Sequence, residues 1–242
     1  PSAAEENGIS KTFFPFSIAG FVSDEKLAAL GYTPIRPMYE GIDMDKTPVY
    51  PQDLTKRILD LRGGTVNFFW LTVHGRKIAD DSEVAPHVRE LADVAEQAGV
   101  KVAIYPHAGF YVATARDALR LVKKVDRKNV GICLTLCHEL AAGNAAELPA
   151  IVKEISPYLF VVTINGADRP PPGQRFGWDR LIQPLGQGDF DVYGFLQCVK
   201  QTSFDGPIGL QCYGLKGDPL VHLSQSIKTW QQYNQRFAAE HK

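Results

Sequence analysis

From residue 65 onward, short apolar runs alternate with amphipathic segments. The runs are rich in β-branched and aromatic residues, are too short for helices and are apolar on both faces, as parallel strands covered by helices are. The predicted strands of this region are 66–73, 101–105, 130–136, 159–164 and 207–212. This alternation predicts an α/β fold of repeated βα units around a parallel sheet.

Helix signals separate these strands. Pro86 stands near the start and Gly99 just past the end of one predicted helix, which is the usual placement of both residue types. Thr114 is the predicted N-cap of the next helix, whose apolar stripe is expected to face the sheet. Further helices are predicted over 147–155, 190–201 and 219–237.

The N-terminal third is less regular. It is predicted to contain strands over 12–18 and 33–39 and helices over 23–30 and 51–61. The chain then has seven strands, or eight if 182–185 is counted, whereas a closed (β/α)8 TIM barrel needs eight. We expect one TIM-barrel domain over 1–242, with 1–11 as a flexible tail and one βα unit shortened or missing near 31–33.

Charge and cysteine usage exclude several classes of function. The chain has 26 Lys+Arg and 27 Asp+Glu, so neither a nucleic-acid binder nor a polybasic membrane anchor is favoured. It has no run of about 18 apolar residues, so no membrane span is expected. The four cysteines lack CxxC spacing and are typical of buried thiols. Because the sequence opens on Pro1, we expect a trimmed, soluble chain, either cytoplasmic or exported after signal cleavage.

Polar residues follow the predicted strands, where a parallel barrel builds its active site. They are Arg36, Tyr39 and Glu40, Thr72 and His74, Tyr105 and His107, Thr135, His138 and Glu139, Thr163, Asn165 and Asp168, and Gln211 and Tyr213. Such a ring of donors, acceptors and aromatic faces suits a polyhydroxylated ligand. A small carbohydrate is therefore the expected partner.

Four segments carry a resemblance to a known family. They are VAIYPH at 102–107, VGICLTLCH at 130–138, PLGQGDFD at 184–191 and GPIGLQ at 206–211. In order and spacing they resemble the xylose isomerase-like TIM-barrel superfamily of sugar isomerases, epimerases and endonuclease IV, over roughly 65–230. The resemblance implies an eight-stranded barrel and a carbohydrate substrate. Endonuclease activity is disfavoured because the multinuclear metal ligands are not retained and no basic groove is evident.

The resemblance also implies a divalent metal, which the residues themselves do not support. The family holds its metal with a Glu, an Asp three residues before a His, a further His and a final Glu. At these four places the chain has Tyr105, Thr135, Thr163 and Gln211. All four are neutral, whereas Mg²⁺ and Mn²⁺ prefer charged oxygen ligands. We therefore expect the usual metal site to be lost, so that a metal-dependent isomerase would rest on fold analogy alone.

Three residues are the candidate catalytic groups. His138 matches a histidine that the family retains, and Glu139 is expected to orient an imidazole or act as a base, unless it is a solvated loop acid. His107 lies in the turn YPHAG, as a substrate contact or acid/base group, or as a hydrogen-bonded rim histidine. Together with His74, the two histidines also allow a relocated site for Zn²⁺ or Mn²⁺. Otherwise His74 is a structural or substrate-binding rim residue.

Without a metal, proton abstraction beside a carbonyl needs a base and neutral donors for the enolate oxygen. The candidate substrate-binding residues are Tyr105, Thr135, Thr163, Asn165, Gln211, Tyr213, His74, Glu40 and Trp178. Several of them serve equally well as polar caps of the barrel interior. Trp178 belongs to a long loop over 168–180 that is expected to close over a sugar or to contact another subunit.

Two hypotheses remain open from the sequence. The first is an isomerase, epimerase or lyase that moves a proton beside the carbonyl of a sugar or keto-sugar, with His138 and His107 as the acid/base pair and Glu139 in support. The second is a carbohydrate-binding barrel without catalysis. An inactive partner in a hetero-oligomer is a weaker third reading, and a homo-oligomer is also left open.

Overall fold

The computed structural model describes residues 15–16, 22–33, 37–64, 66, 68–76, 78–171 and 173–240. Its strands are β1 (Pro15–Phe16), β2 (Met38–Asp43), β3 (Phe68–His74), β4 (Lys101–Ile104), β5 (Val130–Thr135), β6 (Leu159–Ile164) and β7 (Ile208–Gln211). In this part of the chain they form one seven-stranded sheet in the order β1-β7-β6-β5-β4-β3-β2, with every neighbouring pair parallel. The predicted α/β class is confirmed, and the described residues contain one strand fewer than a complete barrel.

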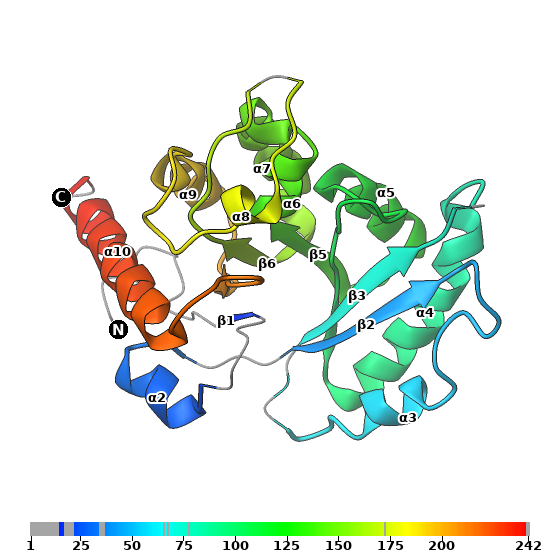
Figure 1. Ribbon diagram of the computed structural model, residues 1–242. Coiled ribbons are helices and arrows are strands. Elements are labelled where there is room, and N and C mark those ends of the chain that lie inside the picture. The colour runs from blue at the N-terminus through cyan, green and yellow to red at the C-terminus, as the bar shows by residue number, and fades with distance from the viewer. Residues whose placement is uncertain are drawn as a thin grey trace.

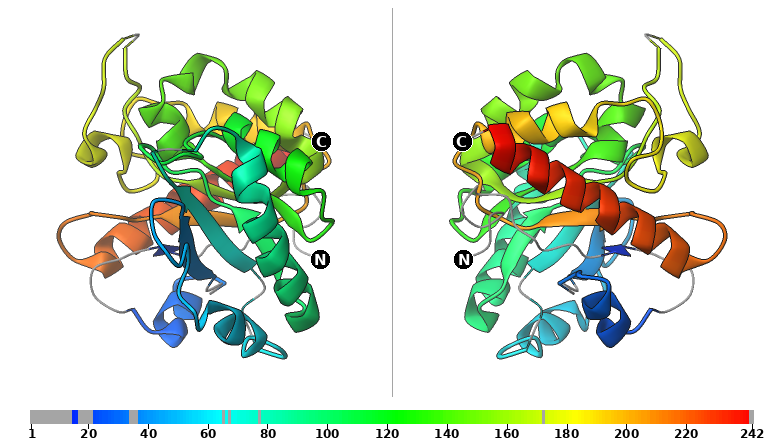
Figure 2. Two further views of the ribbon diagram at one scale, coloured as in Figure 1. Left: turned by 90° about the vertical axis from the view of Figure 1, so that its right-hand side faces the viewer. Right: turned by 90° about the vertical axis from the view of Figure 1, so that its left-hand side faces the viewer.

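Helices surround this sheet on the outside (Figure 1). They are α2 (Asp24–Ala29), α3 (Leu54–Leu59), α4 (Asp81–Ala98), α5 (Ala115–Val125), α6 (Leu136–Ala141), α7 (Leu148–Ile155), α8 (Trp178–Leu181), α9 (Val192–Lys200) and α10 (Pro219–Glu240), with 3-10 turns η1 (Asn144–Ala146) and η2 (Ser156–Tyr158). The helix α10, red in Figure 2, crosses the outside of the sheet beside α9 and α2.

The helix boundaries follow the local signals of the sequence. Gly99 ends α4 with φ 73°, a conformation that glycine adopts without steric cost. Thr114 and Asp117 form a capping box at the start of α5, each side chain bonding the other's backbone N–H. These contacts satisfy backbone donors that a helix start leaves unpaired.

The segment 182–185, which the sequence left open as an eighth strand, is not a strand in the structure. This segment makes one isolated antiparallel bridge, Gly166 to Gln183, and β6 pairs directly with β7. The reason lies in α10, whose Ser226 and Thr229 hydroxyls bond the backbone N–H and carbonyl of Leu185. These backbone groups are therefore not available for a sheet ladder. Some predictions for the N-terminal third lie outside the described residues. These are residues 12–14 and 17–18 of the predicted strand over 12–18, residues 34–36 of the predicted strand over 33–39, and all of the predicted tail over 1–11.

Side chains of the strands alternate between two apolar layers. Phe69, Leu71 and Val73 of β3 pack in the layer between sheet and helices. Phe68 and Trp70 point the other way, into an inner cluster with Ala103, Tyr105, Cys133 and Val161. Because successive strand residues face opposite sides, one apolar run fills both layers. The inner cluster forms the base on which the site is built.

Two further findings concern the cysteines and the helices of the described part of the chain. The four cysteines are free thiols, three of them buried. None of the helices there is both long and apolar enough to cross a membrane.

Candidate functional site

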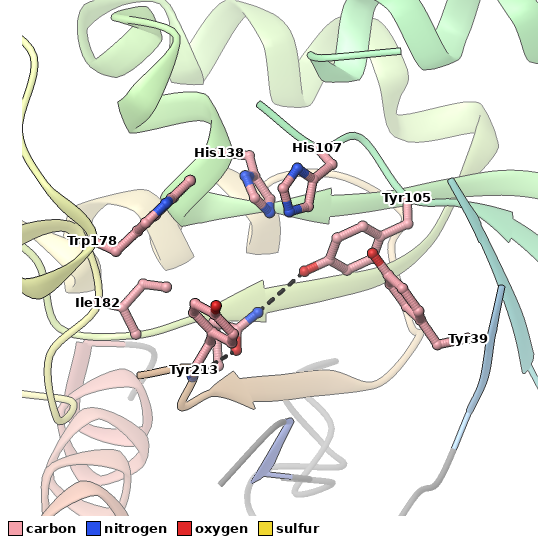
Figure 3. Close-up of a pocket in the computed structure, with 8 residues that line it drawn as sticks. Tyr39, Tyr105, His107, His138, Trp178, Ile182 and Tyr213 are labelled. Atoms are coloured by element: carbon pink, nitrogen blue, oxygen red, sulfur yellow. Dashed lines mark hydrogen bonds between the residues drawn. The ribbon is translucent and has the colours of Figure 1, made fainter. Parts of the chain in front are cut away.

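A cavity of about 370 Å³ opens at the carboxyl ends of the strands. Its size lies at the lower end of the range for small-molecule sites, which fits a ligand the size of a monosaccharide. We call it the histidine cavity; it is lined by Tyr39, Tyr105, His107, His138, Trp178, Ile182, Gln211 and Tyr213. Figure 3 shows the two histidines side by side across from the Tyr105 hydroxyl and Tyr213. Six of the twelve residues that the sequence predicted for the site thus meet in one place.

The two imidazoles are in direct contact. The ring centroids of His107 and His138 are 4.2 Å apart, and Phe110 stacks on the far side of His107 at 4.1 Å. Burial, then the charge of His107, lowers the pKa of His138 to about 3. Burial also lowers the pKa of His107 below its ordinary value. Both rings are therefore neutral near pH 7.

One backbone residue bonds both rings. The Ala108 N–H donates to Nδ1 of His138 over 3.2 Å, and Nδ1 of His107 lies 3.0 Å from the Ala108 carbonyl oxygen. These bonds hold the rings from the side away from the cavity, so that the second nitrogen of each ring faces the cavity (Figure 3).

A neutral hydrogen-bonded group forms the opposite wall. Gln211 Nε2 donates to the Tyr105 hydroxyl over 3.1 Å, and the Tyr213 N–H donates to Gln211 Oε1 over 3.0 Å. Tyr105 stacks on Trp70, with ring centroids 5.2 Å apart. Burial raises the pKa of Tyr105 well above its usual range, so this phenol stays protonated. The wall offers hydrogen bonds but no charge.

Three exposed aromatic residues surround the mouth of the cavity. Tyr39, Trp178 and Tyr213 are 40%, 36% and 55% exposed, and they are the only exposed aromatics among the large apolar side chains of the described residues. Trp178 lies edge-on to His138, with ring centroids 5.2 Å apart. Solvent-exposed aromatic faces gathered at a cavity are typical of a ligand-binding surface.

Glu139 lies outside the histidine cavity although it follows His138 directly. Its carboxylate accepts hydrogen bonds of 2.7 Å from the Ala115 N–H, at the start of α5, and of 2.7 Å from the Asn144 amide. Its side chain is only 1% exposed, and burial raises its pKa. A carboxylate at a helix N-terminus is favoured by the unpaired N–H groups there. This placement favours a structural role over the predicted catalytic one.

Glu40 and His74 also lie outside the cavity lining. Glu40 forms an ion pair with Arg57 of α3. His74 contacts the Thr72 hydroxyl through Nε2 over 3.1 Å, and its ring lies 3.6 Å from Phe110 between centroids. Phe110 therefore contacts both His74 and His107.

Three further predicted residues are buried and do not line the cavity. Thr135 and Thr163 face each other across β5 and β6. The Thr135 hydroxyl lies 3.7 Å from the sulfur of Cys133, whereas the Thr163 hydroxyl has no partner in the described part of the chain. Asn165 donates to the carbonyl oxygens of Gly166 and Leu181 over 2.7 Å each, which fixes the loop that precedes α8.

A divalent cation does not fit these residues. The four positions that the resemblance assigns to the family's metal ligands hold neutral groups, of which Tyr105 and Gln211 already bond each other. Within the described residues, no three His, Cys, Asp or Glu side chains gather where a metal ion would bind. Hard cations need charged oxygen ligands, and a zinc site needs at least three protein ligands. The described residues of this cavity therefore do not fit a divalent metal ion.

Sequence reasoning missed several contributors. Tyr39 follows a predicted strand but is not among the predicted catalytic or substrate-binding residues, and the sequence suggests Ile182 only as part of a possible strand. Neither Phe110 nor the Ala108 backbone is among the predicted site groups. For Ala108 no side-chain signal exists, because its contribution is made entirely by main-chain atoms.

Comparison with known proteins places the chain in a family. The family described as xylose isomerase-like TIM barrel matches residues 52–233. The chain belongs to this family.

Individual relatives match parts of the chain. An inosose isomerase of Bacillus subtilis is 30% identical over 126 residues, which cover 51% of this chain and 44% of that protein. A 3-dehydroshikimate dehydratase of Pseudomonas putida is 24% identical over 205 residues, covering 82% of this chain and 31% of the relative. The chain thus covers less than half the length of these relatives.

Solved structures share the fold. A structure of the IOLI protein with a bound zinc atom has a TM-score of 0.67 at 19% identity, covering 97% of this chain and 91% of that one. A 3-keto-D-glucoside 4-epimerase from E. coli has a TM-score of 0.74 at 14% identity, covering 92% and 99%. These likenesses show the TIM-barrel architecture.

Proposed function

We propose that this protein is an enzyme that moves a proton beside the carbonyl group of a sugar or keto-sugar without a metal ion, through His107 and His138. The observation that carries this proposal is the pair of neutral imidazoles in contact in the wall of a cavity that aromatic residues also line. A general base must be unprotonated at the working pH and within reach of the proton that it removes.

The substrate class is supported by the walls of the cavity. Exposed rings of Tyr39, Trp178 and Tyr213 offer faces for sugar C–H groups, and the Gln211 amide offers hydrogen bonds to hydroxyls. The family relatives point the same way, since their names specify an inosose, a dehydroshikimate and a keto-glucoside. Each of these names denotes a polyhydroxylated carbonyl compound.

The reaction class follows from the same chemistry. Isomerisation, epimerisation and elimination of such compounds all begin when a proton leaves the carbon next to the carbonyl. The negative charge that develops on the oxygen must be stabilised by preorganised donors. In this cavity the donors are neutral groups of the protein, where other barrels use a metal ion.

Proton transfer is tested by solvent exchange. The protein is incubated in D₂O with a panel of ketoses and keto-inositols, and deuterium uptake next to the carbonyl is followed by NMR. We expect uptake into at least one compound with wild type, its loss in His138→Ala and His107→Gln, and its retention in His222→Gln, a matched control in α10. Saturable binding of these compounds with no uptake into any of them would contradict the proposal and identify a carbohydrate-binding barrel without catalysis.

A further inference from the structure

The Ala108 peptide is held rigidly between the two imidazoles. The Phe110 N–H donates to the His107 carbonyl over 3.0 Å and closes a turn in which Gly109 has φ 87°. The His107 N–H donates to the Val112 carbonyl over 3.0 Å. A turn with a positive φ at its third residue is of the kind that glycine favours. The direction of the Ala108 N–H and carbonyl is therefore fixed by the turn and does not depend on the imidazoles.

The two bonds made by Ala108 have opposite polarity. A neutral imidazole has one nitrogen that donates and one that accepts. Because a backbone N–H only donates, Nδ1 of His138 must accept, and the proton of this ring lies on Nε2. Because a carbonyl oxygen only accepts, Nδ1 of His107 must carry the proton, and Nε2 of that ring has a lone pair.

The surroundings keep both rings in these neutral forms. His138 is 4% exposed, and the contact between the rings disfavours a charge on either of them. Phe110 on one side of His107 and Trp178 beside His138 restrict the ring orientations. The second nitrogens of the two rings face the histidine cavity together (Figure 3).

We propose that the Ala108 peptide assigns opposite roles to the two histidines, with His107 as the base and His138 as the hydrogen-bond donor to the substrate oxygen. Ala108 is then a positioning residue. This assignment rests on the proposed function and deepens it, because it defines how a carbonyl substrate lies: its oxygen at His138 Nε2 and its adjacent C–H at His107 Nε2.

The proposed step balances within these groups. The C–H bond breaks, its proton goes to His107 Nε2, and the electron pair forms the C=C bond of an enolate. The enolate oxygen accepts a hydrogen bond from the Nε2–H of His138. Return of a proton from the His107 imidazolium, before or after exchange with water, regenerates a carbonyl compound. A neutral imidazole that donates in this way is a known type of electrophile.

The tautomers can be read directly by NMR on the protein without substrate. In ¹⁵N-labelled protein near pH 7.5, long-range ¹H–¹⁵N spectra distinguish protonated from unprotonated ring nitrogens. We expect the Nδ1–H form for His107 and the Nε2–H form for His138, with signals assigned by their loss in His107→Gln and His138→Gln. The same tautomer in both rings, or a mixture in either, would overturn the proposal even if exchange activity is found.

A backbone variant tests the part played by Ala108. Ala108→Pro removes the N–H at a turn position that proline suits, and Ala108→Gly keeps both backbone groups as the matched control. We expect the His138 signals to lose the pure Nε2–H pattern in Ala108→Pro and to keep it in Ala108→Gly. A His138 tautomer unchanged by proline would show that the peptide does not set it.

An activity comparison separates the two roles. Glutamine donates hydrogen bonds but is not a base, so His107→Gln is expected to lose about 10²- to 10⁴-fold in exchange rate, the usual contribution of a general base. His138→Gln is expected to keep at least about tenfold more activity than His138→Ala, because the amide restores a donor. The reverse ranking, with glutamine tolerated at 107 and no better than alanine at 138, would contradict the assignment. Absence of exchange in wild type would instead count against the proposed function and leave the tautomer result standing.

Discussion

Adjacent residues of one helix reach different surroundings at this site. His138 turns toward the cavity, whereas Glu139 turns toward the start of α5 and Asn144. Successive residues in an α-helix point about 100° apart, since a turn takes 3.6 residues. The sequence predicts polar residues at the end of this strand. It does not predict where the side chains of His138 and Glu139 point, because their directions depend on their positions in the short helix α6.

The first prediction concerns the buried carboxylate. Glu139→Ala leaves the Ala115 N–H without its acceptor and is expected to lower the free energy of unfolding by about 2–3 kcal/mol. Glu139→Gln keeps an acceptor oxygen and is expected to lose less than half of that. Urea denaturation of the two variants measures the difference. If the carboxylate instead acts on substrate, Glu139→Gln will abolish deuterium exchange while unfolding like wild type, which would contradict this placement.

The loop between β6 and α8 brings Trp178 to the cavity. Between β6 and α8 the chain is held by an ion pair of 2.7 Å between Asp168 and Arg180 and by the bond from the Arg169 N–H to Asp189 over 2.6 Å. The Arg180 guanidinium also lies 3.5 Å over the Phe176 ring. The sequence indicated a functional loop here from its length and composition. It did not show that the loop places an indole against His138, since that depends on contacts distant in sequence.

The second prediction follows from this loop. Trp178→Ala removes an aromatic face from the cavity and is expected to weaken substrate binding about tenfold, which corresponds to about 1.4 kcal/mol. The KM for exchange should rise by a larger factor than kcat falls, because the indole makes no bond to the reacting atoms and the Ala108 N–H still holds the His138 ring. Trp178→Phe, which keeps a ring, is the control and should lose less. An unchanged KM in Trp178→Ala would show that the loop serves another purpose, such as a subunit contact.

For the whole molecule, the repeated βα pattern predicted the parallel sheet, the order of its strands along the chain and most helix ends. The apolar runs are locally encoded, so β3 to β7 fall where expected within a few residues. The sequence left open whether 182–185 is a strand, because an apolar run does not reveal that Ser226 and Thr229, about forty residues later, bond the backbone of Leu185. The sequence predicts which polar residues follow the strands. It does not predict which of them line the same cavity, because that depends on how the strands and loops pack in three dimensions.

A third prediction concerns global stability at acid pH. His138 titrates near pH 6.5 when unfolded, whereas burial lowers its pKa to about 3 in the folded protein. The unfolded state therefore binds the proton first, and the stability that neutral His138 provides is present above pH 6.5 and lost as the pH falls toward 3. Between pH 6.5 and 4.5, wild type should lose about 2 kcal/mol more unfolding free energy than His138→Gln. Parallel losses in the two proteins, measured by urea denaturation, would show that His138 is not neutral and buried.

Proton transfer without a metal ion is the activity that we propose for this member of the family. The most direct measurement is the rate of deuterium uptake by a substrate in D₂O, with the metal content of the same sample determined before and after chelation. The account predicts an unchanged rate when metal is far below stoichiometry and no stimulation by added Mn²⁺ or Zn²⁺. Loss of exchange on chelation, with recovery when either ion is restored, would contradict it.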